Sequence, residues 1–80
     1  MKVLFFGQLR EALQTDSVHI NVAVSNVLEL RKALQNKSPL WHNSLEGSVT
    51  LVAVNQTIAN DNTVLEKSDE VAFFPPVTGG

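Results

Sequence analysis

Val71-Ala72-Phe73-Phe74-Pro75-Pro76 is the stretch that decides the fold, and it lies close to the end of the chain. A run of four apolar residues with two aromatic rings predicts a strand. The two consecutive prolines predict its end, because proline has no N–H to donate inside a sheet. Successive side chains of a strand point to opposite faces, so Phe73 and Phe74 send one ring to each side of the sheet.

Four further segments are predicted to be strands from apolar runs or from alternation with period two: residues 3–6, 18–22, 49–54 and 57–59. The first two are expected to pair antiparallel and to be joined by a short helix over residues 8–14. A turn at Asn55-Gln56 separates the last two. Phe5 and Phe6, at the end of the first strand, again point to opposite sides.

One long helix is predicted to begin at Ser25-Asn26. Asn26 and Glu29 resemble a capping box, in which each side chain satisfies an exposed backbone donor near the other residue. The apolar positions at i, i+3 and i+7 predict its buried stripe: Val27, Leu30 and Leu34. Ser38-Pro39 is expected to end the helix, because proline disfavours helical geometry in the residue before it. Residues 40–47 are expected to form an irregular loop.

These elements predict an α+β fold, a sheet with one long helix packed across one face. Arg31, Lys32 and Lys37 lie in the second half of the helix region, where positive charge suits the helix dipole. The strand segments 3–6 and 49–54, like the decisive stretch, are apolar at both alternating positions, which is typical of strands buried on both faces. The second face of the sheet must therefore be covered by loops or by a partner.

Composition limits the function further. The chain has 80 residues, 44% of them hydrophobic, which is enough for one domain with one core. A formal net charge of −2 argues against a nucleic-acid partner, since phosphates require a surplus of lysine and arginine. The apolar run after Met1 is too short for a signal peptide or a membrane span, so we expect a cytoplasmic protein without a membrane partner.

Catalytic and metal-binding patterns are poorly supported. The chain contains no cysteine and two separated histidines, His19 and His42, so neither a metal site nor a bound cofactor is predicted. His19 fits a solvated strand position better than a ligand. Neither a G-x-S-x-G nucleophile elbow nor a phosphate-binding G-x-x-x-x-G-K loop is present. We therefore expect no catalysis by this chain alone.

The end of the chain carries the remaining signal. After Glu70 the terminal carboxylate is the only charge, and the last two residues, Gly79 and Gly80, have no side chains. Proline at the base favours an extended course, and glycine can enter a narrow channel. This combination suits delivery of a carboxylate into the active site of another protein. A frayed terminus is the alternative interpretation.

These segments resemble the small subunits of molybdopterin synthase, a family of sulfur carriers with the ubiquitin-like β-grasp fold. The resemblance extends over essentially the whole chain and is carried by three segments: residues 3–11 (VLFFGQLRE), 54–57 (VNQT) and 69–80 (DEVAFFPPVTGG). It implies a β-grasp domain over residues 1–74, with a mixed sheet, and an extended tail over residues 75–80. Residues 36–48 match nothing in the family pattern, and the roles of Trp41 and His42 stay open.

The resemblance implies that Gly80 is the reacting residue. A partner enzyme would adenylate its carboxylate with ATP and magnesium, and a sulfur donor would convert it to a thiocarboxylate. That sulfur would then be transferred to a cyclic pyranopterin monophosphate precursor to build the molybdopterin dithiolene. The residues that would thread the terminus into the partner are Pro75, Pro76, Val77, Thr78 and Gly79.

The resemblance also implies a large-subunit partner, in a heterotetramer of two small and two large subunits. Phe6, Arg10, Ile58 and Phe74 are the predicted interface residues, whereas Phe5 and Phe73 are assigned to the core. Two alternatives stay open. One is a related β-grasp carrier for thiamine thiazole synthesis or for protein urmylation. The other is a β-grasp interaction module whose tail has no chemistry.

Overall fold

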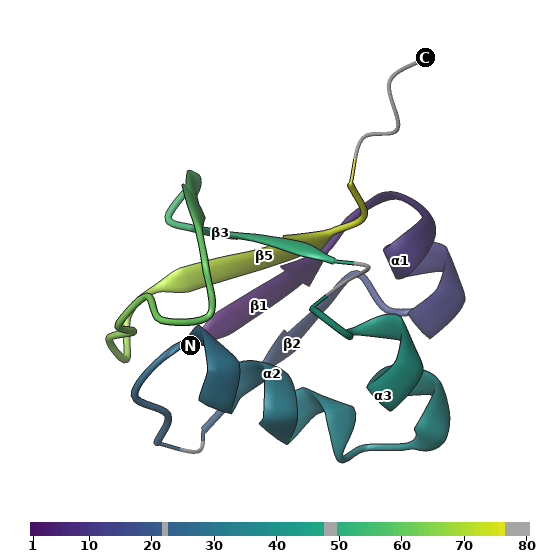
Figure 1. The fold of residues 1–80 in the computed structure, drawn as a ribbon, viewed down its shortest axis with the longest axis horizontal. Coiled ribbons are helices and arrows are strands. Elements are labelled where there is room, and N and C mark those ends of the chain that lie inside the picture. Colours follow the sequence, from purple (N-terminus) through teal and green to yellow (C-terminus); the bar gives the residue numbers. More distant parts are fainter. Residues whose placement is uncertain (22, 48–49, 77–80) are drawn as a thin grey trace.

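The computed structural model describes residues 1–21, 23–47 and 50–76. Within them, three helices lie on one face of a five-stranded sheet with strand order β2-β1-β5-β3-β4 (Figure 1). No helix among the described residues is long and apolar enough to cross a membrane. The elements in chain order are β1 (Lys2–Phe5), α1 (Gly7–Leu13), β2 (Ser17–His19), α2 (Val27–Gln35), α3 (Pro39–Ser44), β3 (Leu51–Val54), β4 (Thr57–Ala59) and β5 (Glu70–Phe74).

The sheet is mixed, as predicted. β1 and β5 pair in parallel at its centre, and β1 pairs antiparallel with β2, as expected for the first two strands. β3 pairs antiparallel with both β4 and β5. β2 ends at His19 and is shorter than the predicted strand over residues 18–22, of which Val22 lies outside the described residues. The strand predicted over residues 49–54 is observed from Leu51 onward, and Val49 also lies outside the described residues.

The predicted start of α2 is confirmed. Asn26 Oδ1 accepts a hydrogen bond from the Glu29 backbone N–H at 2.9 Å, and Glu29 Oε1 accepts one from the Ser25 N–H at 2.8 Å. The carboxylate thus satisfies the donor one residue before the cap, where a capping box would use the cap residue itself. The predicted apolar stripe of α2 is fully buried: Val27, Leu30 and Leu34.

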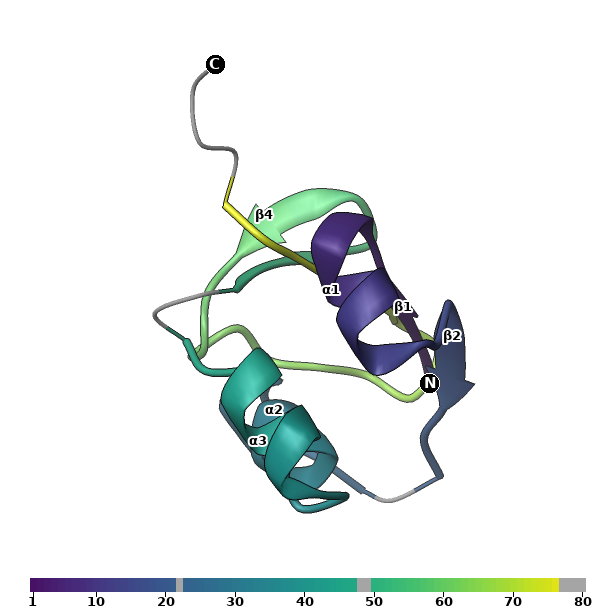
Figure 2. The same ribbon diagram turned by 90° about the vertical axis from the view of Figure 1, so that its right-hand side faces the viewer.

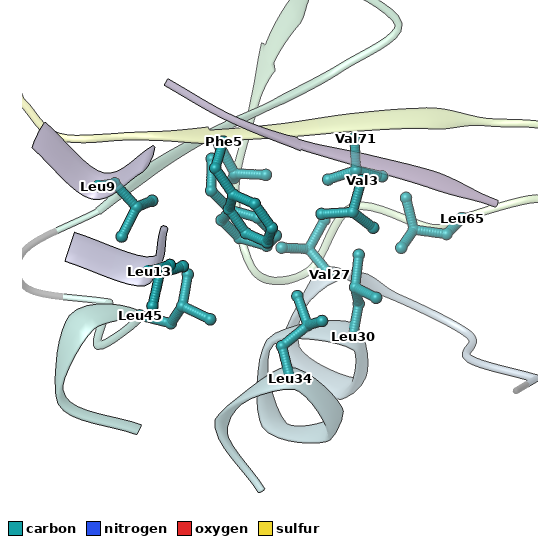
Figure 3. Packing of buried hydrophobic residues seen from close by; sticks show 12 residues of the cluster. Val3, Phe5, Leu9, Leu13, Val27, Leu30, Leu34, Leu45, Leu65 and Val71 are labelled. Carbon is teal, nitrogen blue, oxygen red and sulfur yellow. The ribbon is translucent and has the colours of Figure 1, made fainter. Parts of the chain in front are cut away.

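The core forms one layer between the helices and the sheet (Figure 3). Phe5 and Phe73 come from the two central strands, and their rings stack with centroids 6.3 Å apart. Trp41 meets the Phe5 ring edge-on at 5.4 Å, which gives this residue, unassigned from the sequence, a packing role. Leu9 and Leu13 close the core from α1. The assignment of Phe5 and Phe73 to the core agrees with this burial.

The prediction of an irregular loop over residues 40–47 was wrong, because α3 occupies Pro39–Ser44. Ser38 is its N-cap, and the Ser38 Oγ accepts a hydrogen bond from the Trp41 N–H at 3.3 Å. Proline suits the first turn of a helix, where its missing N–H would have no intrahelical partner anyway. α2 ends at Gln35, before Ser38-Pro39, and α3 adds a third helix to the short and the long helix predicted from the sequence.

Arg31, which was predicted only to place positive charge in the second half of the helix, is a buried residue with several partners. It is only 5% exposed, and its guanidinium donates to Leu45 O at 2.7 Å, to Thr50 Oγ1 and to Asp61 Oδ1 at 3.0 Å. The same group lies 5.2 Å from the centroid of the Phe73 ring. Arg31 thus ties α2 to the segments that flank β3 and β4.

The predicted turn at Asn55-Gln56 is confirmed. Both residues have left-handed backbone angles, with φ of 50° and 69°, as expected for a two-residue hairpin turn between β3 and β4. The Asn55 amide donates to Asp69 Oδ1 at 2.9 Å and accepts from the Glu70 N–H at 3.0 Å. These bonds tie the hairpin to the start of β5.

Candidate functional site

The second face of the sheet is not covered by any described helix, and its side chains follow from the strand register. Leu4 of β1 lies opposite Ala72 of β5, Ala72 lies opposite Ala53 of β3, and Ala53 lies opposite Ile58 of β4. Because Val3, Phe5, Val71 and Phe73 face the core, these alternate positions face outward. An apolar row therefore crosses four strands on the open face.

A second apolar row runs beside the first, toward the end of the sheet where the tail begins. Phe74 lies opposite Leu51. Phe6 follows β1 directly, and its N–H donates to Phe73 O at 3.1 Å, which sets Phe6 beside Phe74. We call the two rows together the docking face, and its members are Leu4, Phe6, Leu51, Ala53, Ile58, Ala72 and Phe74.

Three large side chains of the docking face are exposed, whereas Leu4 and Phe74 are half-buried. Ile58 is 71% exposed, Phe6 47% and Leu51 43%. Aromatic and aliphatic groups held on a rigid sheet are typical of protein-binding surfaces. The structure thus brings three of the predicted interface residues, Phe6, Ile58 and Phe74, onto one surface.

Leu51 belongs to the same surface and was missed from the sequence. Residues 49–54 are apolar throughout, so the run alone gives no indication of which side chains face outward. Only the pairing of Leu51 with Phe74 places it beside the predicted residues. Side chains of the last strand alternate between the two faces, and applying the same alternation to the antiparallel neighbour would have identified Leu51.

Arg10 lies elsewhere. It is on α1, and its Nε lies 3.7 Å from Asp16 Oδ1, just before β2. β2 and β4 are the two opposite edges of the sheet, so Arg10 lies toward the edge farthest from Ile58. Its role as an interface residue stays a prediction.

The base of the tail is next to the docking face. In Figures 1 and 2 the chain leaves β5 at the end of the sheet where α1 begins. Pro75 is half-buried and Pro76 is exposed. The four remaining tail residues with predicted roles lie outside the described residues: Val77, Thr78, Gly79 and Gly80.

The described residues hold no group of three or more side chains that could bind a metal ion. His19 is exposed on β2 opposite Lys2, and the His42 Nε2 lies 3.8 Å from Glu46 Oε1 on the surface. Asp69 lies just before β5, and its carboxylate accepts two hydrogen bonds. Hydrogen bonds from the Glu66 N–H and the Asn55 amide lower its pKa, because they stabilise the carboxylate. These groups are dispersed, and no nucleophile and base are brought together among them.

A β-grasp domain with one open apolar face beside its C-terminal segment is the class of protein that this geometry defines. A model of the ThiS family matches residues 3–80, and the chain belongs to that family. It is similar to the molybdopterin synthase sulfur carrier subunit of Escherichia coli (strain K12), with 45% identity over 80 residues that cover 100% of this chain and 99% of the relative.

Two solved structures share the fold over nearly the full length of both chains. SAMP1 from Haloferax volcanii matches with a TM-score of 0.77 and 27% identity, over 100% of this chain and 98% of that one. A chain in the complex of subunits 1 and 2 of molybdopterin-converting factor from Helicobacter pylori 26695 matches with a TM-score of 0.68 and 31% identity, over 99% of this chain and 96% of that one. The ubiquitin-like β-grasp fold predicted from the sequence is thereby confirmed.

Proposed function

We propose that this chain is a sulfur carrier, the small subunit of a molybdopterin synthase. The observation that carries the proposal is the 45% identity to the Escherichia coli sulfur carrier subunit over the full length of both proteins. Two features of this chain support it independently. The docking face offers a surface for a partner, and the sequence ends in Gly79-Gly80 beyond a tail that carries no charged side chain.

The chemistry begins with activation of the Gly80 carboxylate. A carboxylate has no good leaving group, so a partner enzyme joins it to the phosphate of AMP from ATP, with magnesium, and releases pyrophosphate. A sulfur donor then attacks the acyl carbon and AMP leaves, which gives a thiocarboxylate. The chain contains no cysteine, so the sulfur must come from outside it.

The thiocarboxylate then serves as the nucleophile. Its sulfur forms a bond to a carbon of a cyclic pyranopterin monophosphate while a carbon–oxygen bond at that carbon breaks, and water then cleaves the bond between the sulfur and the acyl carbon. The carboxylate of Gly80 is regenerated, and the carrier can be loaded again. Two sulfurs make a dithiolene, so two loaded carriers are consumed for each product.

The large subunit of the synthase is the partner in this proposal, in a heterotetramer of two small and two large subunits. The likeness to a chain in the Helicobacter pylori complex of two subunits supports such a partner. The docking face supports it too, because exposed aromatic and aliphatic residues are the usual anchors of an interface. A partner covering this face would lie beside Pro75, where the tail begins.

Intact-mass spectrometry tests the proposal. We expect incubation with the activating enzyme, ATP, magnesium and a sulfur source to exchange one oxygen of the chain for one sulfur. The matched control is the same chain with one alanine added after Gly80, which should stay unchanged because the carboxylate has moved beyond the glycine tip. Absence of the exchange with an activating enzyme proven on another carrier would contradict the proposal.

A protein modifier is the second candidate, because the fold also matches SAMP1, a small archaeal modifier protein. A modifier would form an amide bond between Gly80 and a lysine of another protein, and a thiazole-pathway carrier would pass sulfur to a different acceptor. A module without tail chemistry would tolerate the added alanine. The cytoplasmic location predicted from the sequence belongs to the main proposal, since activation requires a supply of ATP.

A further inference from the structure

Gly7, the residue after Phe6, lies next to Pro75 at the base of the tail. Gly7 has a left-handed φ of 60°, and a Cβ built on it would lie 3.4 Å from Pro75 Cγ and 3.5 Å from Pro75 Cδ. The proline ring of the tail therefore lies beside Gly7, at van der Waals distance from the place that a Cβ would occupy. A single methyl group would still fit in ordinary van der Waals contact, although any side chain at this φ strains the backbone, and a branched side chain would crowd the ring.

This contact is held in place from both sides. Phe5 pairs with Phe73 in the parallel register, and the Phe6 N–H donates to Phe73 O at 3.1 Å. Phe6-Gly7 and Phe74-Pro75 thus run side by side, and each pair gives one ring to the docking face. Gly7 and Pro75 each follow one of those rings in the chain, and they lie next to each other. Whatever binds the docking face is therefore in fixed register with the start of the tail.

We propose that Gly7 is a positioning residue for sulfur transfer, because it seats Pro75 and so sets the direction in which the tail leaves the domain. The inference rests on the function proposed above. Pro75-Pro76 is conformationally stiff, so the direction set at the seat passes along the chain.

Gly7→Val tests the seat, because valine adds two γ carbons to a Cβ that would already lie within 3.5 Å of the Pro75 ring. Valine at a left-handed φ also strains the backbone, and Gln14→Val controls for that strain. Gln14 caps the same helix at the end opposite Gly7, with a φ of 53°. Both variants should lose thermal stability, and Trp41 fluorescence measures that loss and fixes a temperature at which both are folded.

The carriers are supplied already thiocarboxylated by semisynthesis, so that activation cannot limit the reaction. With the large subunit and cyclic pyranopterin monophosphate, we expect Gly7→Val to lower the rate constant of transfer by about tenfold or more, the scale on which small misplacements act. Its affinity for the large subunit should stay within about twofold of wild type, because the anchoring side chains are unchanged. Gly7→Ala and Gln14→Val should transfer at nearly the wild-type rate.

Two further measurements separate a seat from a general loss of stability. Nuclear Overhauser contacts between the Gly7 Hα and the Pro75 ring protons should be present in the wild type and lost in Gly7→Val. Pro75→Ala removes the ring, so Gly7→Val should cost far less transfer in that background. Equal losses in Gly7→Val and Gln14→Val, or an unimpaired Gly7→Val, would overturn the inference. A wild-type carrier that transfers no sulfur would instead overturn the proposed function.

Discussion

Arg31 is the residue whose replacement should cost most among the polar side chains. Its guanidinium is buried and satisfies Leu45 O, Thr50 and Asp61 together. Arg31→Ala removes the guanidinium that these three groups share, and Leu45 and Thr50 are buried, so we expect the free energy of unfolding to fall by roughly 2–4 kcal/mol. Urea unfolding followed by Trp41 fluorescence measures this change in the free energy of unfolding.

Lys32→Ala is the matched control for Arg31→Ala, because Lys32 is the exposed neighbour on the same helix. Its effect should stay within about 0.5 kcal/mol. Equal effects of the two substitutions would show that the buried hydrogen bonds of Arg31 contribute little.

Asp69 links stability to pH. Its pKa in the folded chain is lowered from the ordinary 3.8 by hydrogen bonds from the Glu66 N–H and the Asn55 amide. A lowered pKa means that the carboxylate stabilises the fold above pH 3.8, and that this contribution is lost as the pH falls through the folded pKa. Asn55→Ala should raise the pKa of Asp69, as read from its carboxyl carbon in an NMR titration. An unchanged titration would contradict the assigned cause.

Among the helices, α3 shows how far one cap can decide an element. Ser38 Oγ accepts from the Trp41 N–H, and the helix is only six residues long. Ser38→Ala should cost about 1 kcal/mol, or about 4–8 °C in the unfolding midpoint of a domain of this size. Differential scanning calorimetry checks the shift. Ser68→Ala, in an exposed turn, should leave the midpoint nearly unchanged, and an equal shift there would argue against the cap.

The elements also show what the sequence can and cannot predict. The Asn26 cap and the stripe of Val27, Leu30 and Leu34 predicted α2 because local hydrogen bonds and period suffice for it. α3 was missed because Ser38-Pro39 satisfies the rules for a helix end and for a helix start alike. The burial of Arg31 could not be predicted, since its partners come from segments up to 30 residues away in the chain.

At the scale of the whole molecule, only part of the docking face could be predicted from the sequence. Phe6, Ile58 and Phe74 were predicted from alternation and resemblance, whereas the other residues of the face are identified only by the strand register. The tail was predicted as a functional segment. That Pro75 at its base lies next to Gly7 is indicated by no local pattern. The residue pattern alone does not predict contacts between elements that are far apart in the sequence.

Ile58 tests the docking face against the rest of the surface. Ile58→Asp places a charge within the apolar rows, so we expect affinity for the large subunit to fall by about tenfold or more. Val64 is equally exposed, at 71%, but pairs with Asn26 outside the named strands. Val64→Asp is therefore the control and should change affinity by less than about twofold. Isothermal titration calorimetry measures both, and equal losses would contradict a docking role for the face.

The central claim is that the terminal carboxylate of Gly80 carries sulfur, and the mass of the terminal peptide measured from cells tests it most directly. Lys67 is the last basic residue, so trypsin releases residues 68–80 as one peptide. In cells that contain the activating enzyme and the sulfur donor but lack an active large subunit, this peptide should accumulate with one oxygen replaced by sulfur. A peptide found only with an ordinary carboxylate, in cells whose activating enzyme is functional, would contradict the claim.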